Sequence, residues 1–201
     1  GENNYSVWKL GRELPYSSND TKANLGYFKN VFWNSAYTGI SLYNDASASI
    51  TNYVLNGGNF FISVAEVKDT SFTWFPIDSI IPLTGQYAQI SSNVTLYSQV
   101  DSTLDLRTDD EQGIYLDLEG FENEDDPNFR SLYRLQLPED QFDEWVGTPN
   151  VCGVYQYQYP LSAGKAVLLS LPVHNGYAPL LDGNSNYLDF LNYLINVEFS
   201  E

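Results

Sequence analysis

One short stretch, "VLNGGNFFIS" (54–63), constrains the fold more than any other part of the chain. Upstream of it, apolar residues between 46 and 54 recur at spacings of three and four, as on one face of a helix, and Asp45 can cap the first turn. The glycines at 57 and 58 can supply the left-handed conformation that ends a helix. The pattern predicts a helix, a glycine turn and then a buried strand at 59–63.

Apolar runs elsewhere extend this unit. "YSVWKL" (5–10) and the segment 31–34 within "YFKNVFWNSA" read as strands, and "KAVLLSLPV" (165–173) suits a buried parallel strand. "NSNYLDFLNYLINV" (184–197) has the apolar spacing of an amphipathic helix. Strand–helix–strand units imply a parallel sheet with helices packed outside it.

The middle of the chain has a different character. From about 81 to 160, β-prone runs alternate with turn-rich and acidic stretches, which favours an antiparallel β-rich insertion. No internal repeat is visible, so residues 1–201 are expected to form one domain. The predicted fold class is therefore α/β: a parallel sheet flanked by helices, with a β-rich antiparallel insertion in the middle of the chain.

Several core stretches together resemble a known family. "VWKLGRELP", "NVFWNSA", "ASITNYVLNGGNFFIS", "GKAVLLSLPVHN" and "LDFLNYLINVEF" are similar to the class I glutamine-amidotransferase-like (flavodoxin-like) domain, of the non-catalytic accessory type found in secreted bacterial multidomain proteins. The match covers roughly 5–66 and 164–199. It implies an amidotransferase-like fold and an extracellular or cell-surface location. Abundant Tyr, Asn and Ser with scarce Lys is also typical of secreted bacterial proteins.

The resemblance points to a pocket that has lost its nucleophile. Active amidotransferases carry a Cys in the turn after the strand that corresponds to 59–63, and here Ser63 to Glu66 stand at that turn. His174 takes the place of the family's catalytic His, without the Glu that normally follows it. The resemblance implies a vestigial pocket of Ser63, Glu66 and His174. Cys152 lies far away in the insertion and is interpreted as a small buried hydrophobic residue.

An alternative keeps the pocket active. Ser63 and His174 could form a Ser–His hydrolase, with Glu66 or Asp69 orienting the imidazole. No G-x-S-x-G turn surrounds Ser63, so the simpler interpretation is a strand-end serine and a loop histidine.

Charge excludes some partners. The 26 acidic residues against nine basic ones give a formal charge of −17, which repels nucleic acid. No apolar run reaches 18 residues, so no membrane insertion is expected. The single Cys excludes an internal disulfide.

Acidic stretches raise the question of calcium. "DLEGFENEDDPNF" (117–129) and "LPEDQFDEW" (137–145) are expected to be loops with solvated charge. In 182–189, four side chains partly imitate a calcium loop, but helix capping explains them more simply: Asp182, Asn184, Asn186 and Asp189. No cofactor is expected.

Tyrosines alternate in "YQYQYP" (155–160), which places Tyr155, Tyr157 and Tyr159 on one face of a strand. An exposed row could bind a glycan or a protein, whereas a buried row would fill the core. Three functions remain open: a non-catalytic interaction or structural module of a secreted or cell-surface protein, the Ser–His hydrolase, and a carbohydrate-binding module. The missing Cys favours the first.

The front of the chain suggests an open edge. Only four residues precede the strand at 5–10, whereas domains of the resembled family begin with an additional strand and helix. We expect an unpaired sheet edge that another polypeptide or a second copy covers. The chain would then be a processed or excised part of a larger protein or assembly.

Overall fold

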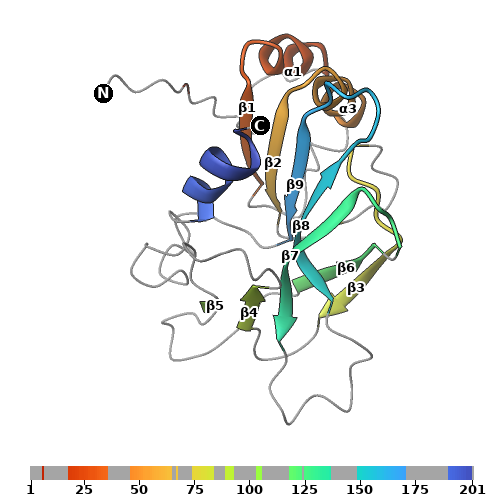
Figure 1. Cartoon of the computed structure of the whole chain (residues 1–201), viewed down its shortest axis with the longest axis vertical. Coiled ribbons are helices and arrows are strands. Elements are labelled where there is room, and N and C mark those ends of the chain that lie inside the picture. The colour runs from red at the N-terminus through yellow and green to blue at the C-terminus, as the bar shows by residue number, and fades with distance from the viewer. Residues whose placement is uncertain are drawn as a thin grey trace.

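The computed structural model describes residues 6, 18–35, 46–64, 67, 74–83, 89–92, 103–105, 118–123, 125–136, 149–170 and 190–200. Within these residues, one sheet dominates (Figure 1). Its nine strands are β1 (Asn30–Ser35), β2 (Asn59–Val64), β3 (Ser79–Leu83), β4 (Gln89–Ser92), β5 (Thr103–Asp105), β6 (Leu118–Glu122), β7 (Phe129–Gln136), β8 (Asn150–Gln156) and β9 (Lys165–Leu169). The helical elements are α1 (Ser18–Leu25), α3 (Ser47–Leu55) and the π-helix η3 (Leu194–Glu198).

The sheet is mixed. Its strand order is β1-β2-β9-β8-β7-β4-β5, and β6 pairs with both β8 and β3 off this path. The pairs β1–β2 and β2–β9 are parallel, and every other strand pair in the described residues is antiparallel. The β7–β8 ladder is irregular, with register shifts on either side of Tyr133.

The predicted fold class is therefore wrong. The described residues form a mixed, largely antiparallel sheet with three short helical elements, not a parallel sheet flanked by helices. The segment 81–160 is not a separate insertion, because its last strand, β8, belongs to the main sheet. β8 pairs with β9 from Cys152–Leu169 to Gln156–Lys165 and so joins the antiparallel strands to the parallel ones. A strand–helix–strand pattern constrains only its own neighbouring strands. It does not determine how the sheet continues beyond them.

The predicted helix and the glycine turn after it are both present, but the helix begins one residue later than Asp45 as its N-cap would imply. α3 buries Ser49, Ile50, Tyr53 and Val54, and its N-cap is Ala46, not the predicted Asp45. Gly57 has a φ of +94°, and the Gly58 N–H donates to the Tyr53 carbonyl at 3.0 Å. Such a left-handed glycine ends the helix and turns the chain into β2.

Both faces of the sheet are covered. Phe60 and Ile62 face α3, where they pack in one cluster with Trp74. Phe61 points to the opposite face because side chains alternate along a strand, and its ring contacts Phe190 just before η3. The core is thus two apolar layers, one on each side of the parallel strands.

A buried amide joins the parallel strands to the end of the chain. The Asn59 side chain donates to the Asn30 side-chain oxygen at 2.9 Å and to the Phe199 carbonyl at 3.3 Å. Its own oxygen accepts the Lys165 N–H at 3.0 Å. One side chain therefore ties β1, β2, β9 and the segment after η3 together at one end of the sheet.

Candidate functional site

Ser63 is the only residue of the predicted pocket that the structure describes. It lies near the end of β2, beside Asn34 of β1 and Leu169 of β9, and its exposed fraction is 0%. By strand alternation its side chain shares the face of Phe61. The Ser63 hydroxyl is therefore closed to a substrate in this structure. Glu66, Asp69 and His174 lie outside the described residues, so their approach to Ser63 stays a prediction.

Cys152 is confirmed as a buried residue. It is a free thiol with an exposed fraction of 0%, in the middle of β8. Burial raises the pKa of the Cys152 thiol well above its usual value, and the nearby Glu198 charge raises it further. Because the thiolate is the reactive form, this Cys is a poor nucleophile.

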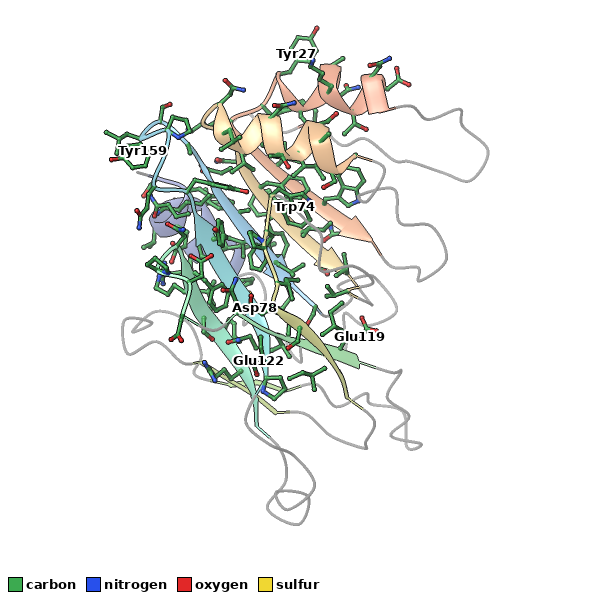
Figure 2. The ribbon with its side chains drawn as sticks, turned by 90° about the vertical axis from the view of Figure 1, so that its right-hand side faces the viewer. Tyr27, Trp74, Asp78, Glu119, Glu122 and Tyr159 are labelled. Atoms are coloured by element: carbon green, nitrogen blue, oxygen red, sulfur yellow. The ribbon has the colours of Figure 1, made fainter. Side chains whose placement is uncertain are left out.

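No metal centre is visible in the part of the chain that the structure describes: no three His, Cys, Asp or Glu side chains there are grouped to hold an ion. The weak calcium candidates Asp182, Asn184, Asn186 and Asp189 lie outside the described residues, as does the acidic stretch 137–145. Glu119 and Glu122 lie on β6, and Asp78 immediately precedes β3, with which β6 pairs (Figure 2). The stretch 117–129 was predicted as a loop, but it contains β6 and the start of β7.

A buried carboxylate links η3 to the sheet. Glu198 is 3% exposed, and its Oε1 lies 2.5 Å from Nη2 of Arg130, on β7. The Tyr193 hydroxyl donates to the same Oε1, and Oε2 of Glu198 lies 3.7 Å from Nζ of Lys165, on β9. Burial would lower the pKa of Arg130, but the hydrogen bond and charge of Glu198 outweigh burial and raise that pKa. The arrangement is a structural clamp on the face that carries Cys152.

The tyrosine ladder is not a flat exposed row. Tyr155 is 5% exposed, Tyr157 is half-buried and Tyr159 is 79% exposed. The Tyr155 and Tyr157 rings meet edge to face, with centroids 5.0 Å apart and planes at 72°. The Tyr155 hydroxyl donates to Oδ2 of Asp126 at 2.9 Å. Burial raises the pKa of Tyr155 and raises that of Tyr157 to about 12. These two rings belong to the core rather than to a binding platform.

Exposed apolar side chains lie instead on two turns at the end of the sheet where α1 and α3 lie. Tyr27 is 80% exposed and Leu161 is 91% exposed, with Phe28 and Tyr159 also exposed. They come from the α1–β1 turn and the β8–β9 turn. Figure 2 shows Tyr27 and Tyr159 at this end, both pointing away from the fold. We call Tyr27, Phe28, Tyr159 and Leu161 the sheet-end patch.

The two turns that carry the patch are fixed to the end of α3. Nζ of Lys29 donates to the Gly57 carbonyl at 2.6 Å, and the Gly164 N–H donates to the Val54 carbonyl at 2.8 Å. The Tyr53 hydroxyl donates to the Lys29 carbonyl at 2.8 Å. Each turn is therefore held by hydrogen bonds although its apolar side chains face solvent. Sequence reasoning missed the patch, because the turns are about 130 residues apart in the chain.

Comparison with known proteins shows a similar fold but indicates no function. No protein-family model matches the sequence, and no curated protein matches it. The chain is similar to the solved structure of "Cytoplasmic Protein STM1381 from Salmonella typhimurium LT2", with a TM-score of 0.53 and 13% identity over 92% of this chain and 77% of that chain. It is also similar to "Cytoplasmic Protein STM3548 from Salmonella typhimurium", with a TM-score of 0.48 and 11% identity over 90% and 76%.

These findings correct two expectations. The amidotransferase-like (flavodoxin-like) resemblance is wrong, because the sheet is mixed and largely antiparallel and the neighbour with a TM-score of 0.53 is named only as a cytoplasmic protein. The expected extracellular or cell-surface location is also contradicted, since the first neighbour is named a cytoplasmic protein, which points away from secretion. At 13% identity that likeness establishes the fold alone.

One partner expectation can be checked directly. Among the described residues, no helix has both the length and the apolar character needed to cross a bilayer.

Proposed function

We propose that this chain is a non-catalytic interaction module that binds another polypeptide through the sheet-end patch. The observation that carries the proposal is the exposure of Tyr27, Tyr159 and Leu161, at 80%, 79% and 91%, on turns that are held in place. Single exposed apolar residues are ordinary on protein surfaces. We interpret these four residues as one binding surface because two hydrogen-bonded turns carry them at the same end of the sheet.

The residue types fit a protein partner. Tyrosine is enriched at the energetic centres of interfaces, because its ring offers large contact area at a small cost in side-chain entropy. Since hydrogen bonds to α3 already fix both turns, a partner would have little backbone ordering to impose.

Charge favours one kind of partner. A chain with a formal charge of −17 attracts basic surfaces over distances of about 8–10 Å at moderate salt. We therefore propose a partner with an apolar pocket bordered by Lys and Arg. Raising the salt concentration should slow association more than it speeds dissociation.

The other two candidate functions find less support. A Ser–His hydrolase would need an accessible Ser63, and the described side chain is fully buried. A carbohydrate-binding module would need flat coplanar rings, and Tyr155 and Tyr157 meet edge to face.

The test has two stages. A photo-crosslinking residue at position 161 identifies the partner in cells, and the affinity is then measured with purified proteins. Tyr159→Ser with Leu161→Ser should weaken binding by about tenfold or more. The control is Ile195→Ser, on an apolar residue of η3 that is 43% exposed, and it should leave the affinity unchanged. Equal affinities for the patch variant and the unmodified chain would overturn the proposal.

A further inference from the structure

β1 is the outer strand at one end of the sheet and, among the residues that the structure describes, pairs with β2 alone (Figure 1). Its outer edge has none of the features that usually protect a strand edge, because Asn30–Ser35 contains no proline and no charged residue. Val31, Phe32 and Trp33 on this strand are half-buried rather than buried. An edge of this kind offers backbone N–H and C=O groups to an incoming strand.

Symmetry restricts how two copies of β1 can pair. Most homodimers have a two-fold axis, and two edge strands related by an axis perpendicular to the sheet run antiparallel. Such an axis keeps each face of the sheet on its own side, and residues that lie opposite each other in an antiparallel pair point to the same face. Because successive side chains alternate between faces, the axis must pass through a residue that pairs with its own copy.

The sequence of β1 is complementary to itself about one such residue. With the axis at Phe32, this ring lies opposite its own copy, and Val31 lies opposite Trp33. Asn30 then lies opposite Asn34. An axis at either neighbouring residue would instead place an asparagine opposite Phe32. Pairs of aromatic residues, and pairs of an aromatic with a β-branched residue, are favourable across strands, so the register centred on Phe32 is the preferred one.

The packing of β1 assigns these pairs to the two faces of the sheet. Val31 and Trp33 pack against the core cluster on the side of α3. Phe32 lies on the other face, with its ring centroid 5.6 Å from that of Phe61 and 6.0 Å from that of Phe199. Pairing of two β1 strands therefore continues both apolar layers of the core across the axis, and it covers side chains that are half-buried in one copy.

The distribution of charge permits this contact. A formal charge of −17 opposes non-specific contacts between two copies. The sequence from Thr21 to Asn44, which contains β1, has no Asp or Glu, and the residue just before the strand is Lys29. In the register centred on Phe32, Lys29 lies opposite Ser35, at each end of the paired strands. Each copy therefore presents a positive charge beside an acidic partner, which favours association.

We propose that two copies of this chain dimerise by antiparallel pairing of β1 with β1, with the two-fold axis at Phe32. This inference goes beyond the proposed function, which concerns a different polypeptide bound at the sheet-end patch. Tyr159 and Leu161 of that patch lie on the turn between β8 and β9, and β2 separates β9 from β1 in the sheet. The two surfaces can therefore be tested separately.

Sedimentation equilibrium on the full 201-residue chain measures the association state. The unmodified chain should form a dimer. Tyr159→Ser with Leu161→Ser should dimerise to the same extent, because neither residue is on β1 or on its neighbour β2. A monomer at the highest concentration measured overturns the proposal. A dimer that these two substitutions dissociate also overturns it, because the second copy would then bind at the sheet-end patch.

Disulfide formation tests the register. Phe32→Cys places two thiols opposite each other at the axis, at a Cα separation of about 4.5–5.5 Å that a disulfide can bridge. Mild oxidation should then give a covalent dimer. Asn34→Cys is the matched control on the same strand, because its two copies lie about 13 Å apart along the paired strands and should not crosslink. Cys152 is buried, so the unmodified chain should not crosslink either. Equal crosslinking of the two variants, or none in a folded Phe32→Cys variant, overturns the proposal.

Hydrogen exchange on the unmodified chain locates the interface without any substitution. The β1 amides that point away from β2 should exchange about tenfold or more slowly in the dimer than in the monomer obtained by dilution. The β2 amides are the internal control, because β2 is paired on both sides within one copy. Their exchange should not change on dilution. If the outward β1 amides exchange equally fast in both states, the two copies pair elsewhere and the proposal is overturned.

Discussion

At the scale of single residues, the buried carboxylate of Glu198 should matter for stability. It is 3% exposed and lies against Arg130 and Lys165, whose side chains come from two different strands. Glu198→Gln removes the negative charge that lies against Arg130 and against Lys165, which is itself 8% exposed. Removing one partner of a buried ion pair costs about 3–5 kcal/mol, and the exposed side of Arg130 places this case at about 3 kcal/mol.

Urea unfolding measures that loss. Asp125→Asn is the control, because Asp125 is exposed and its φ of +59° suits Asn equally well. The control should stay within about 0.5 kcal/mol of the unmodified chain. A Glu198→Gln variant as stable as this control would show that the clamp contributes nothing.

Residues differ in how far the sequence predicts their surroundings. The burial of Cys152 follows from its type and from the apolar stretch around it, and the structure confirms it. The Glu198 clamp could not be predicted, because Arg130 and Lys165 are far from Glu198 along the chain and come together only through sheet pairing. The partial burial of the tyrosines was also left open, since a period of two shows which residues share a face but not which face is covered.

At the scale of elements, the turn between β8 and β9 requires glycine at position 164, because a residue with a side chain does not fit there. A Cβ on Gly164 would lie 2.1 Å from the Gly58 carbonyl oxygen, a backbone atom that cannot move aside. Gly164→Ala should therefore destabilise the chain by about 2–3 kcal/mol, as overpacking does. It should also break the Gly164-to-Val54 hydrogen bond that holds one half of the sheet-end patch.

Gly26→Ala provides the comparison, because the atoms nearest to its added Cβ are 3.8 Å away or more. Thermal unfolding of both variants is the measurement, and Gly26→Ala should stay close to the unmodified chain. Equal melting temperatures for the two variants would contradict the tight approach of the two glycines.

Elements were predictable where local pattern suffices. The sequence places strands at 31–34 and 59–63, close to β1 and β2, and the glycine turn ends α3 where expected. The C-terminal helix is different: only its part from 190 onward is described, and it closes as a π-turn with the Phe199 N–H donating to the Leu194 carbonyl. A π-turn has no separate sequence pattern. Glu198 lies in this turn and contacts Arg130 and Lys165 of the sheet.

At the scale of the whole molecule, the fold class was wrong because strand pairing is non-local. Patterns near Gly57 correctly indicate a strand–helix–strand unit, but they contain no information on the strand that follows β9 in space. That neighbour is β8, whose antiparallel ladder with β9 joins the two halves of the sheet. Because of this pairing, the segment that the sequence predicts as an insertion is part of the same sheet as the parallel strands.

High pH should destabilise the whole molecule through its buried tyrosines. The pKa of Tyr157 is raised to about 12, first by burial and then by the charges of Tyr155 and Asp126, and the pKa of Tyr155 is raised as well. An unfolded Tyr ionises near pH 10. Because the folded pKa is higher, the stabilisation is complete below about pH 10 and is lost as the pH rises toward about 12. Each ionised Tyr also adds charge to a chain already at −17.

Tyr157→Phe removes one of these ionisations and should therefore reduce the loss of stability between about pH 10 and 12. The reduction should be on the order of 1 kcal/mol, because the ring is only half-buried and solvent screens its charge. Urea midpoints measured across this range give the difference. Tyr159→Phe, on a ring that is 79% exposed, is the matched control and should follow the pH profile of the unmodified chain. If both variants keep that profile, the half-buried Tyr157 is not a source of the alkaline instability, and the accumulated charge of the whole chain is the better explanation.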